Sequence, residues 1–174
     1  MKKQLTTSLL LLSITIYATT ATVDAHSSCA DIATLEKRLT QSEKPEKLLL
    51  QMGAAAEKMD VEMKVYRQNP DYKNICHLKI VKSENFGNFP SYSGYHYYQI
   101  LEKYPKSDLA DDAAFALIYV ITEDTYNFSD TCIEKKKLET FLKQYPDSNK
   151  AEEAKARIEE IDVQLKNGEP PILD

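Results

Sequence analysis

The sequence predicts an all-α fold in which antiparallel helix pairs stack into a short helical-repeat solenoid. Three observations support this prediction. Strong helix formers, mainly Ala, Leu, Glu and Lys, dominate the 174 residues, which include only four glycines and no tryptophan. Residues 98–118 and 139–159 resemble each other at an offset of 41 positions. In both copies an amphipathic helical pattern stops at a Tyr-Pro pair and then resumes.

The first segment, residues 1–25, is expected to be a cleaved signal peptide. Lys2 and Lys3 precede the apolar stretch 9–18, and Val23-Asp24-Ala25 fits the small-x-small rule for signal-peptidase cleavage. This stretch is shorter than the roughly 20 residues that a membrane-spanning helix needs. We therefore expect a periplasmic or secreted chain that begins at His26, with a second possible cleavage site after Ala21.

The exported chain would keep three cysteines, Cys29, Cys76 and Cys132. An oxidising compartment favours one disulfide and one remaining thiol, and the alternative is three free thiols. We favour the pair Cys76–Cys132, because neighbouring repeats lie side by side and each cysteine precedes one of them. Lipidation of Cys29 is disfavoured, since His26 stands where a lipoprotein signal requires an aliphatic residue.

Residues 26–82 are expected to form an N-terminal helical hairpin, either a degenerate first repeat or a cap. A short helix is expected over 31–41, and Pro45 fits the first turn of the next helix. Strong helical character covers 48–66. Residues 83–94, with two glycines, are expected to form a loop.

Two repeats are expected over residues 95–167. Pro105 disfavours helical geometry at Tyr104 and ends the first helix there. Ser107 or Asp108 can then cap the second helix. The remaining motif positions are Ala110 and Ala113 in the first copy and Tyr145, Pro146, Ser148, Ala151 and Ala154 in the second. Gly168 is expected to stop the last helix before a tail over 168–174.

This Tyr-Pro-x-Ser-x-x-Ala-x-x-Ala string resembles the tetratricopeptide (TPR) proteins of bacterial envelopes. It is similar to strings in the outer-membrane barrel-assembly lipoprotein and in the periplasmic cell-division coordinator family. The resemblance implies superhelical TPR-like helix pairs and a concave groove that binds protein. The spacing of 41 residues differs from the usual 34, and the extra residues fall near 126–130. Since about three units normally stack, the N-terminal hairpin should cap the repeats or the chain should form a homodimer.

Four tyrosines cluster where the first repeat begins. Tyr95 and Tyr98 are three positions apart, so we expect both in the core of the first helix. Tyr92 and Tyr97 remain possible partner-binding residues, because tyrosine is enriched at interaction hot spots.

Candidate chemistry is sparse, and we expect no cofactor or resident metal. A newly exposed His26 could chelate copper with a second histidine, and the adjacent Cys76 and His77 could bind zinc, but no further ligand motif supports either site. His96 is expected at the surface or the edge of the core. The run 135–137 is basic, but it is expected to form a solvated helix face.

The sequence favours a function in protein binding. Its net charge of −5 argues against partners such as nucleic acid or anionic lipid. No nucleophile or phosphate-binding motif is present. We expect a non-enzymatic scaffold or adaptor that binds another protein or peptide in the cell envelope. The alternative is an inhibitor or immunity-type protein that blocks an exported enzyme.

Overall fold

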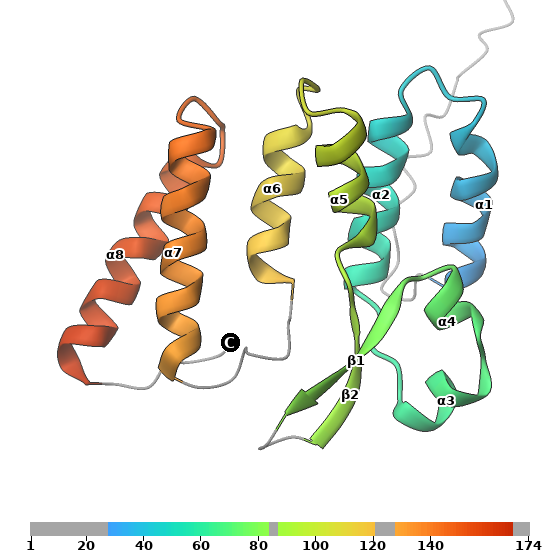
Figure 1. Ribbon diagram of the computed structural model, residues 1–174, viewed down its shortest axis with the longest axis horizontal. Helices are drawn as coiled ribbons and strands as arrows, with labels where there is room; N and C mark the ends of the chain where they lie inside the picture. The colour runs from blue at the N-terminus through green and yellow to red at the C-terminus, as the bar shows by residue number, and fades with distance from the viewer. Residues whose placement is uncertain (1–27, 84–86, 121–127, 169–174) are drawn as a thin grey trace, which may run out of the picture.

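The computed structural model describes residues 28–83, 87–120 and 128–168, and these residues are mostly helical (Figure 1). The elements are α1 (Cys29–Leu39), α2 (Pro45–Glu57), α3 (Met63–Gln68), α4 (Asp71–Asn74), β1 (Leu78–Ser83), β2 (Gly87–Tyr92), α5 (Tyr95–Lys103), α6 (Ala110–Tyr119), α7 (Phe128–Gln144) and α8 (Ala151–Asn167). The prediction of a mostly helical chain is confirmed. The signal peptide and His26 lie outside the described residues.

Six of the helices form a single row. Going along the chain, α1 packs on α2, α2 on α5, α5 on α6, α6 on α7 and α7 on α8. Figure 1 shows this row from blue α1 on the right to red α8 on the left. The short helices α3 and α4 and the β-hairpin are inserted between α2 and α5, and in Figure 1 they lie below α1, α2 and α5.

The N-terminal helices begin with local signals. Ser28 and Asp31 form a capping box on α1, in which Asp31 N donates to Ser28 Oγ and Ser28 N donates to Asp31 Oδ2. Pro45 occupies the first turn of α2, as predicted. The prediction of one helix over 48–66 is wrong, because α2 ends at Glu57 and α3 begins six residues later.

The segment between α2 and α3 is not helical, and tertiary packing of its side chains explains why. Met59 and Val61 pack from this linker against the buried cluster that contains Met52 and Cys76. Continuing α2 would carry both side chains past this cluster. Packing of apolar side chains therefore overrides the helical propensity of the segment.

The predicted loop over 83–94 is also wrong, because residues 87–92, half of this segment, form the strand β2. The two strands pair antiparallel, with Leu78 opposite Tyr92 and Ile80 opposite Pro90. Pro90 and Tyr92 point inward and are buried. A strand containing proline is tolerated here because each strand of a two-stranded sheet has an unpaired edge, where the missing N–H costs no ladder bond.

The helix pairs α5–α6 and α7–α8 are joined by turns with the same hydrogen bonds. Tyr104 N donates to Ile100 O, and the equivalent Tyr145 N donates to Phe141 O, both at 2.8 Å. The Ser107 and Ser148 hydroxyls each accept from the amide two residues later, at 3.2 and 3.0 Å. The Tyr-Pro-x-Ser motif therefore builds the same turn twice.

The motif alanines lie where the helices touch. Ala113 and Ala154 are both fully buried, and Ala110 and Ala151 are nearly so. A methyl group is the largest side chain that such close helix contacts admit without displacement of a neighbour. All four motif alanines are therefore buried within the helix pairs.

The outer faces of α6 and α8 differ. In α6, Phe115 and Ile118 are buried against Leu138 and Phe141 of α7. The equivalent positions of α8 carry Ala156 and Glu159, and both are exposed. The last helix of the row therefore presents a polar side to solvent, as the terminal units of helical arrays do.

The disulfide joins Cys29 and Cys76, so the predicted pair Cys76–Cys132 is wrong. The two Cα atoms are 5.5 Å apart, whereas Cys132 lies on α7 as an exposed free thiol. The reason is topological: the insertion brings Cys76 back to the start of α1, whereas α7 packs on α6 and α8. The bond also occupies the sulfur of Cys29 that a lipid thioether would need.

Candidate binding groove

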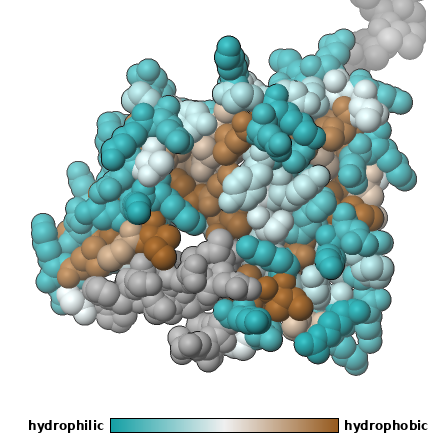
Figure 2. Space-filling view, in the orientation of Figure 1, coloured by the Kyte–Doolittle hydropathy of each residue, from teal (hydrophilic) through white to brown (hydrophobic). Residues whose placement is uncertain are grey.

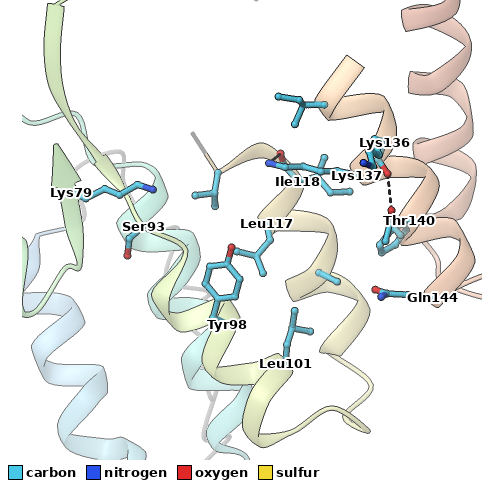
Figure 3. Close-up of a pocket in the computed structure, with 14 residues that line it drawn as sticks. Lys79, Ser93, Tyr98, Leu101, Leu117, Ile118, Lys136, Lys137, Thr140 and Gln144 are labelled. Atoms are coloured by element: carbon cyan, nitrogen blue, oxygen red, sulfur yellow. Dashed lines mark hydrogen bonds between the residues drawn. The ribbon is translucent and has the colours of Figure 1, made fainter. Parts of the chain in front are cut away.

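A largely apolar groove is bounded by α5, α6 and α7, with β1 at one end (Figure 3). Its volume is about 410 Å³, within the range of small ligand and peptide sites. Apolar side chains form most of its wall: Tyr98, Leu101, Ala114, Leu117, Ile118, Val120, Ile133 and Phe141. The space-filling view shows apolar surface emerging between α6 and α7 on an otherwise largely hydrophilic face (Figure 2).

Tyr98 is the most exposed aromatic residue of this wall. Its side chain is 57% exposed, and Figure 3 shows its ring between Leu101 and Leu117. Large exposed tyrosines at concave surfaces are typical of interaction hot spots. Gly94 stands beside this wall in the left-handed conformation, at φ +81°, and a Cβ there would approach Leu117 Cδ2 to 2.6 Å.

The predictions for the tyrosines are reversed. Tyr92 and Tyr97, considered as partner-binding residues, are only 4% and 2% exposed. Tyr95 and Tyr98, expected in the core, are 41% and 57% exposed. The cause is that α5 packs on α2 as well as on α6, so the side of α5 that carries Tyr97 faces the core.

Buried hydrogen bonds hold the two core tyrosines. Tyr97 donates its hydroxyl proton to Glu57 Oε2 at 2.9 Å, and burial raises the pKa of this phenol. The Tyr92 oxygen accepts from the backbone N of His96 at 2.8 Å and lies 2.9 Å from His96 Nδ1. The tautomer of His96 decides which of the two groups donates in the contact between the Tyr92 hydroxyl and Nδ1.

His96 is therefore a core residue rather than the surface or core-edge residue that was expected. It is 3% exposed, and burial, followed by the nearby His77, lowers its pKa to about 3. The His77 ring stacks on Tyr95 with 3.6 Å between the ring centroids and lies edge-on to His96 at 5.1 Å. This aromatic cluster packs the base of α5 against the β-hairpin.

The zinc pair that was considered and disfavoured from the sequence is not formed, because the sulfur of Cys76 is bonded to Cys29. Within the described parts of the chain, no three His, Cys, Asp or Glu side chains gather as a metal site would require. His26, the proposed copper ligand, lies outside those parts. No helix among the described residues is long and apolar enough to cross a membrane.

Three lysines line the groove alongside its apolar wall. Lys79 comes from β1, and Lys136 and Lys137 come from α7. Among the described residues that line the groove there is no aspartate or glutamate. This is notable in a chain with 27 acidic and 22 basic residues, because the groove has the opposite sign to the molecule as a whole.

The basic run over 135–137, expected to be one solvated face, points in three directions. Lys135 pairs with Asp162 of α8. Lys136 is exposed at the groove, and Lys137 is partly buried with its Nζ 3.3 Å from Ile118 O. Successive residues of a helix are about 100° apart, so three adjacent lysines face three surroundings.

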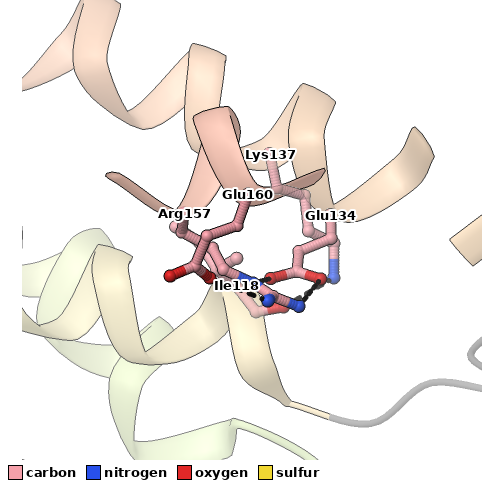
Figure 4. Close-up of polar contacts among 5 residues, drawn as sticks. All are labelled: Ile118, Glu134, Lys137, Arg157 and Glu160. Atoms are coloured by element: carbon pink, nitrogen blue, oxygen red, sulfur yellow. Dashed lines mark hydrogen bonds and ion pairs between the residues drawn. The ribbon is translucent and has the colours of Figure 1, made fainter. Parts of the chain in front are cut away.

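The carboxylate nearest to Lys137 belongs to a different interaction. Glu134 accepts from Arg157 Nε at 2.8 Å and from Arg157 Nη2 at 3.2 Å, while Arg157 Nη1 reaches Glu160 (Figure 4). Burial lowers the pKa of Lys137, the charge of the nearby Glu134 raises it, and the charge of Lys79 lowers it by a smaller amount. Lys137 thus donates to a backbone carbonyl and forms no ion pair with any described residue.

No protein-family model matches this chain, and no curated protein or solved structure is significantly similar to it. The groove could not be located from the sequence. Lys79 and Lys137 are distant along the chain, and the hairpin that brings Lys79 to the groove was expected to be a loop. Exposure of Tyr98 required knowing that α2 covers the other side of α5.

Proposed function

We propose that this protein is an exported, non-enzymatic adaptor that holds a segment of another protein in the groove of α5, α6 and α7. The observation that carries the proposal is the wall itself: a concave apolar surface that remains open to solvent beside an exposed tyrosine. Exposed apolar area is costly to keep in water, and a contiguous patch typically marks an interaction site.

The arrangement of helices supports this reading. Two helix pairs with the same turn stand side by side, and the groove lies where α6 meets α7, at the junction of the two pairs. Arrays of helix pairs create extended concave surfaces that bind peptides and partner domains. We therefore regard the two pairs as TPR-like repeats and the row that continues through α1 and α2 as a short solenoid.

The cell envelope is the proposed location. The Cys29–Cys76 disulfide fits an oxidising compartment, and the expected signal peptide would direct export of the chain to it. The disulfide also ties the insertion to α1, which keeps β1 and Lys79 in place at the end of the groove.

Site-specific photo-crosslinking tests the function. A photoreactive amino acid at Tyr98 should crosslink a defined partner in an envelope extract, and the same group at Val163, 55% exposed on α8, should not. The partner should then be purified and its affinity measured by calorimetry. Tyr98→Ala should weaken binding at least tenfold.

Tyr119→Ala is the matched control, because Tyr119 is also exposed but does not line the groove. Equal affinity of the wild-type chain and Tyr98→Ala would show that the groove is not the binding surface. If the partner is a secreted enzyme whose activity stops on binding, the adaptor is of the inhibitor type.

A further inference from the structure

We infer that the segment held in the groove is acidic, with aliphatic side chains on the apolar wall and carboxylates on Lys79, Lys136 and Lys137. This inference rests on the proposed function and specifies the chemistry of the partner. It is carried by the charge of the described lining residues, which include three ammonium groups and no carboxylate, in a chain of net charge −5. Complementary charge selects partners and steers their approach.

The lysines come to the groove from opposite sides. Lys79 extends from β1 toward α6, and Lys137 reaches Ile118 from α7 (Figure 3). The charge of Lys79 reaches Lys137 and lowers its pKa, against the opposing effect of Glu134. A carboxylate placed between two ammonium groups would remove this repulsion and form charge-assisted hydrogen bonds with both.

Two described carboxylates that lie beside the lysines of α7 are already engaged. Glu134 is held by Arg157 through two hydrogen bonds, and Asp162 is paired with Lys135 (Figure 4). Moving either of them to the groove would break an existing ion pair. The lysines of the groove are therefore available to a partner. Lys135, by contrast, is already paired with Asp162 of the same chain.

The surroundings favour a short acidic segment over a long polyanion. Binding of nucleic acid or an anionic membrane depends on many basic groups spread over a wide surface. Here three lysines surround an apolar wall in an acidic chain, so a polyanion would meet repulsion outside the groove. Leu101, Leu117 and Phe141 offer contacts that only apolar side chains of a partner would use.

Defined peptides test the inference on the mature chain. The probe is a fluorescein-labelled peptide with two central leucines flanked on each side by one aspartate and one glutamate. Its matched partners carry Asn and Gln, or lysines, in place of the acidic residues. Fluorescence anisotropy should show at least tenfold tighter binding of the acidic peptide, and the difference should shrink as salt rises from 50 to 500 mM.

Variants of the groove lysines should show the same dependence on the charge of the peptide. Lys79→Gln and Lys136→Gln should each weaken binding of the acidic peptide about three- to tenfold while leaving the amide peptide unaffected. Lys143→Gln is the matched control, because Lys143 is an exposed residue of α7 outside the groove. Unchanged affinity in both groove variants would overturn the inference.

Other outcomes separate this inference from the proposed function. Equal affinity for the acidic and amide peptides, with loss of both in Tyr98→Ala, would reject the charge preference but keep the groove as a binding surface. Displacement of the acidic peptide by micromolar dodecanoate would identify an anionic amphiphile as the occupant. A tenfold gain on ending the chain at Gly168 would identify residues 169–174 as the occupant. Both results would overturn the inference.

Discussion

Gly53 of α2 lies directly against the ring of Tyr97 of α5. A Cβ at Gly53 would be 2.4 Å from Tyr97 Cε1 and 2.8 Å from Tyr97 Cδ1 and Cζ, distances at which something must move. The ring cannot swing away without cost, because Tyr97 is 2% exposed and its hydroxyl is bonded to Glu57. The absence of a side chain at Gly53 therefore allows α2 to approach α5 this closely.

Gly53→Ala is expected to destabilise the protein despite the better helix propensity of alanine. The propensity gain is about 1 kcal/mol, and overpacking of a rigid contact costs about 1–3 kcal/mol. Urea denaturation should therefore show a lower midpoint. In a Tyr97→Leu background the same change should become neutral or stabilising, and an undiminished loss there would place the clash elsewhere.

Ala113→Leu and Ala154→Leu should each lower stability by about 1–3 kcal/mol, because both alanines are fully buried at helix contacts. Ala156→Leu makes the same chemical change two residues further along α8, at an exposed position, and should shift the thermal midpoint much less. Comparable losses in Ala154→Leu and Ala156→Leu would contradict the assigned faces of α8.

Peptide mapping under non-reducing conditions should recover the Cys29–Cys76 crosslink, and iodoacetamide should label Cys132 in the folded protein. Replacing Cys29 and Cys76 by serine should cost about 4 kcal/mol, the chain-entropy value for a sequence separation of 47 residues. Cys132→Ser should leave the thermal midpoint unchanged. A peptide that joins Cys76 to Cys132 would refute the disulfide described above.

His96 should make the fold sensitive to mild acid. Its pKa falls from 6.5 to about 3 on folding, mainly through burial, so the unfolded chain binds the proton more readily. The stability that this histidine contributes is complete above pH 6.5 and is lost as the pH falls toward 3. The loss approaches about 1.4 kcal/mol per pH unit within this window.

Urea denaturation at pH 7.5, 5.5 and 4.5 measures this effect. The His77 pKa is also lowered by burial and contributes in the same direction, whereas Glu36 opposes it. The decisive quantity is therefore the difference between the wild-type chain and His96→Gln. The variant should lose less stability on acidification, and identical slopes for the two proteins would exclude His96 as the cause.

The sequence predicted the helix pairs well because their signals are local. The Tyr-Pro break, the serine two positions after the proline and the small residues at Ala113 and Ala154 act within a single turn or at a single contact. Pro45 and Gly168 likewise mark the start and the end of a helix through their own backbone geometry.

What the sequence could not predict depends on neighbours far along the chain. In α5, Tyr95 and Tyr98 form one helical stripe and Tyr97 and Ile100 form another, so periodicity alone cannot decide which is buried. The choice is made by α2, whose contact with α5 buries Tyr97 and leaves Tyr98 at the groove. The groove and the disulfide both depend on the insertion, and the hairpin within it lacks the alternation that marks most strands.

The polar outer side of α8 also constrains how this protein could be lengthened. A further helix pair appended after Gly168 would meet Ala156, Glu159 and the exposed Val163, and would find little apolar surface on which to pack. A pair inserted after Tyr119 would meet Phe115 and Ile118 on one side and the apolar face of α7 on the other. A duplicated helix pair would therefore find apolar packing partners in the middle of the row and few of them at its C-terminal end.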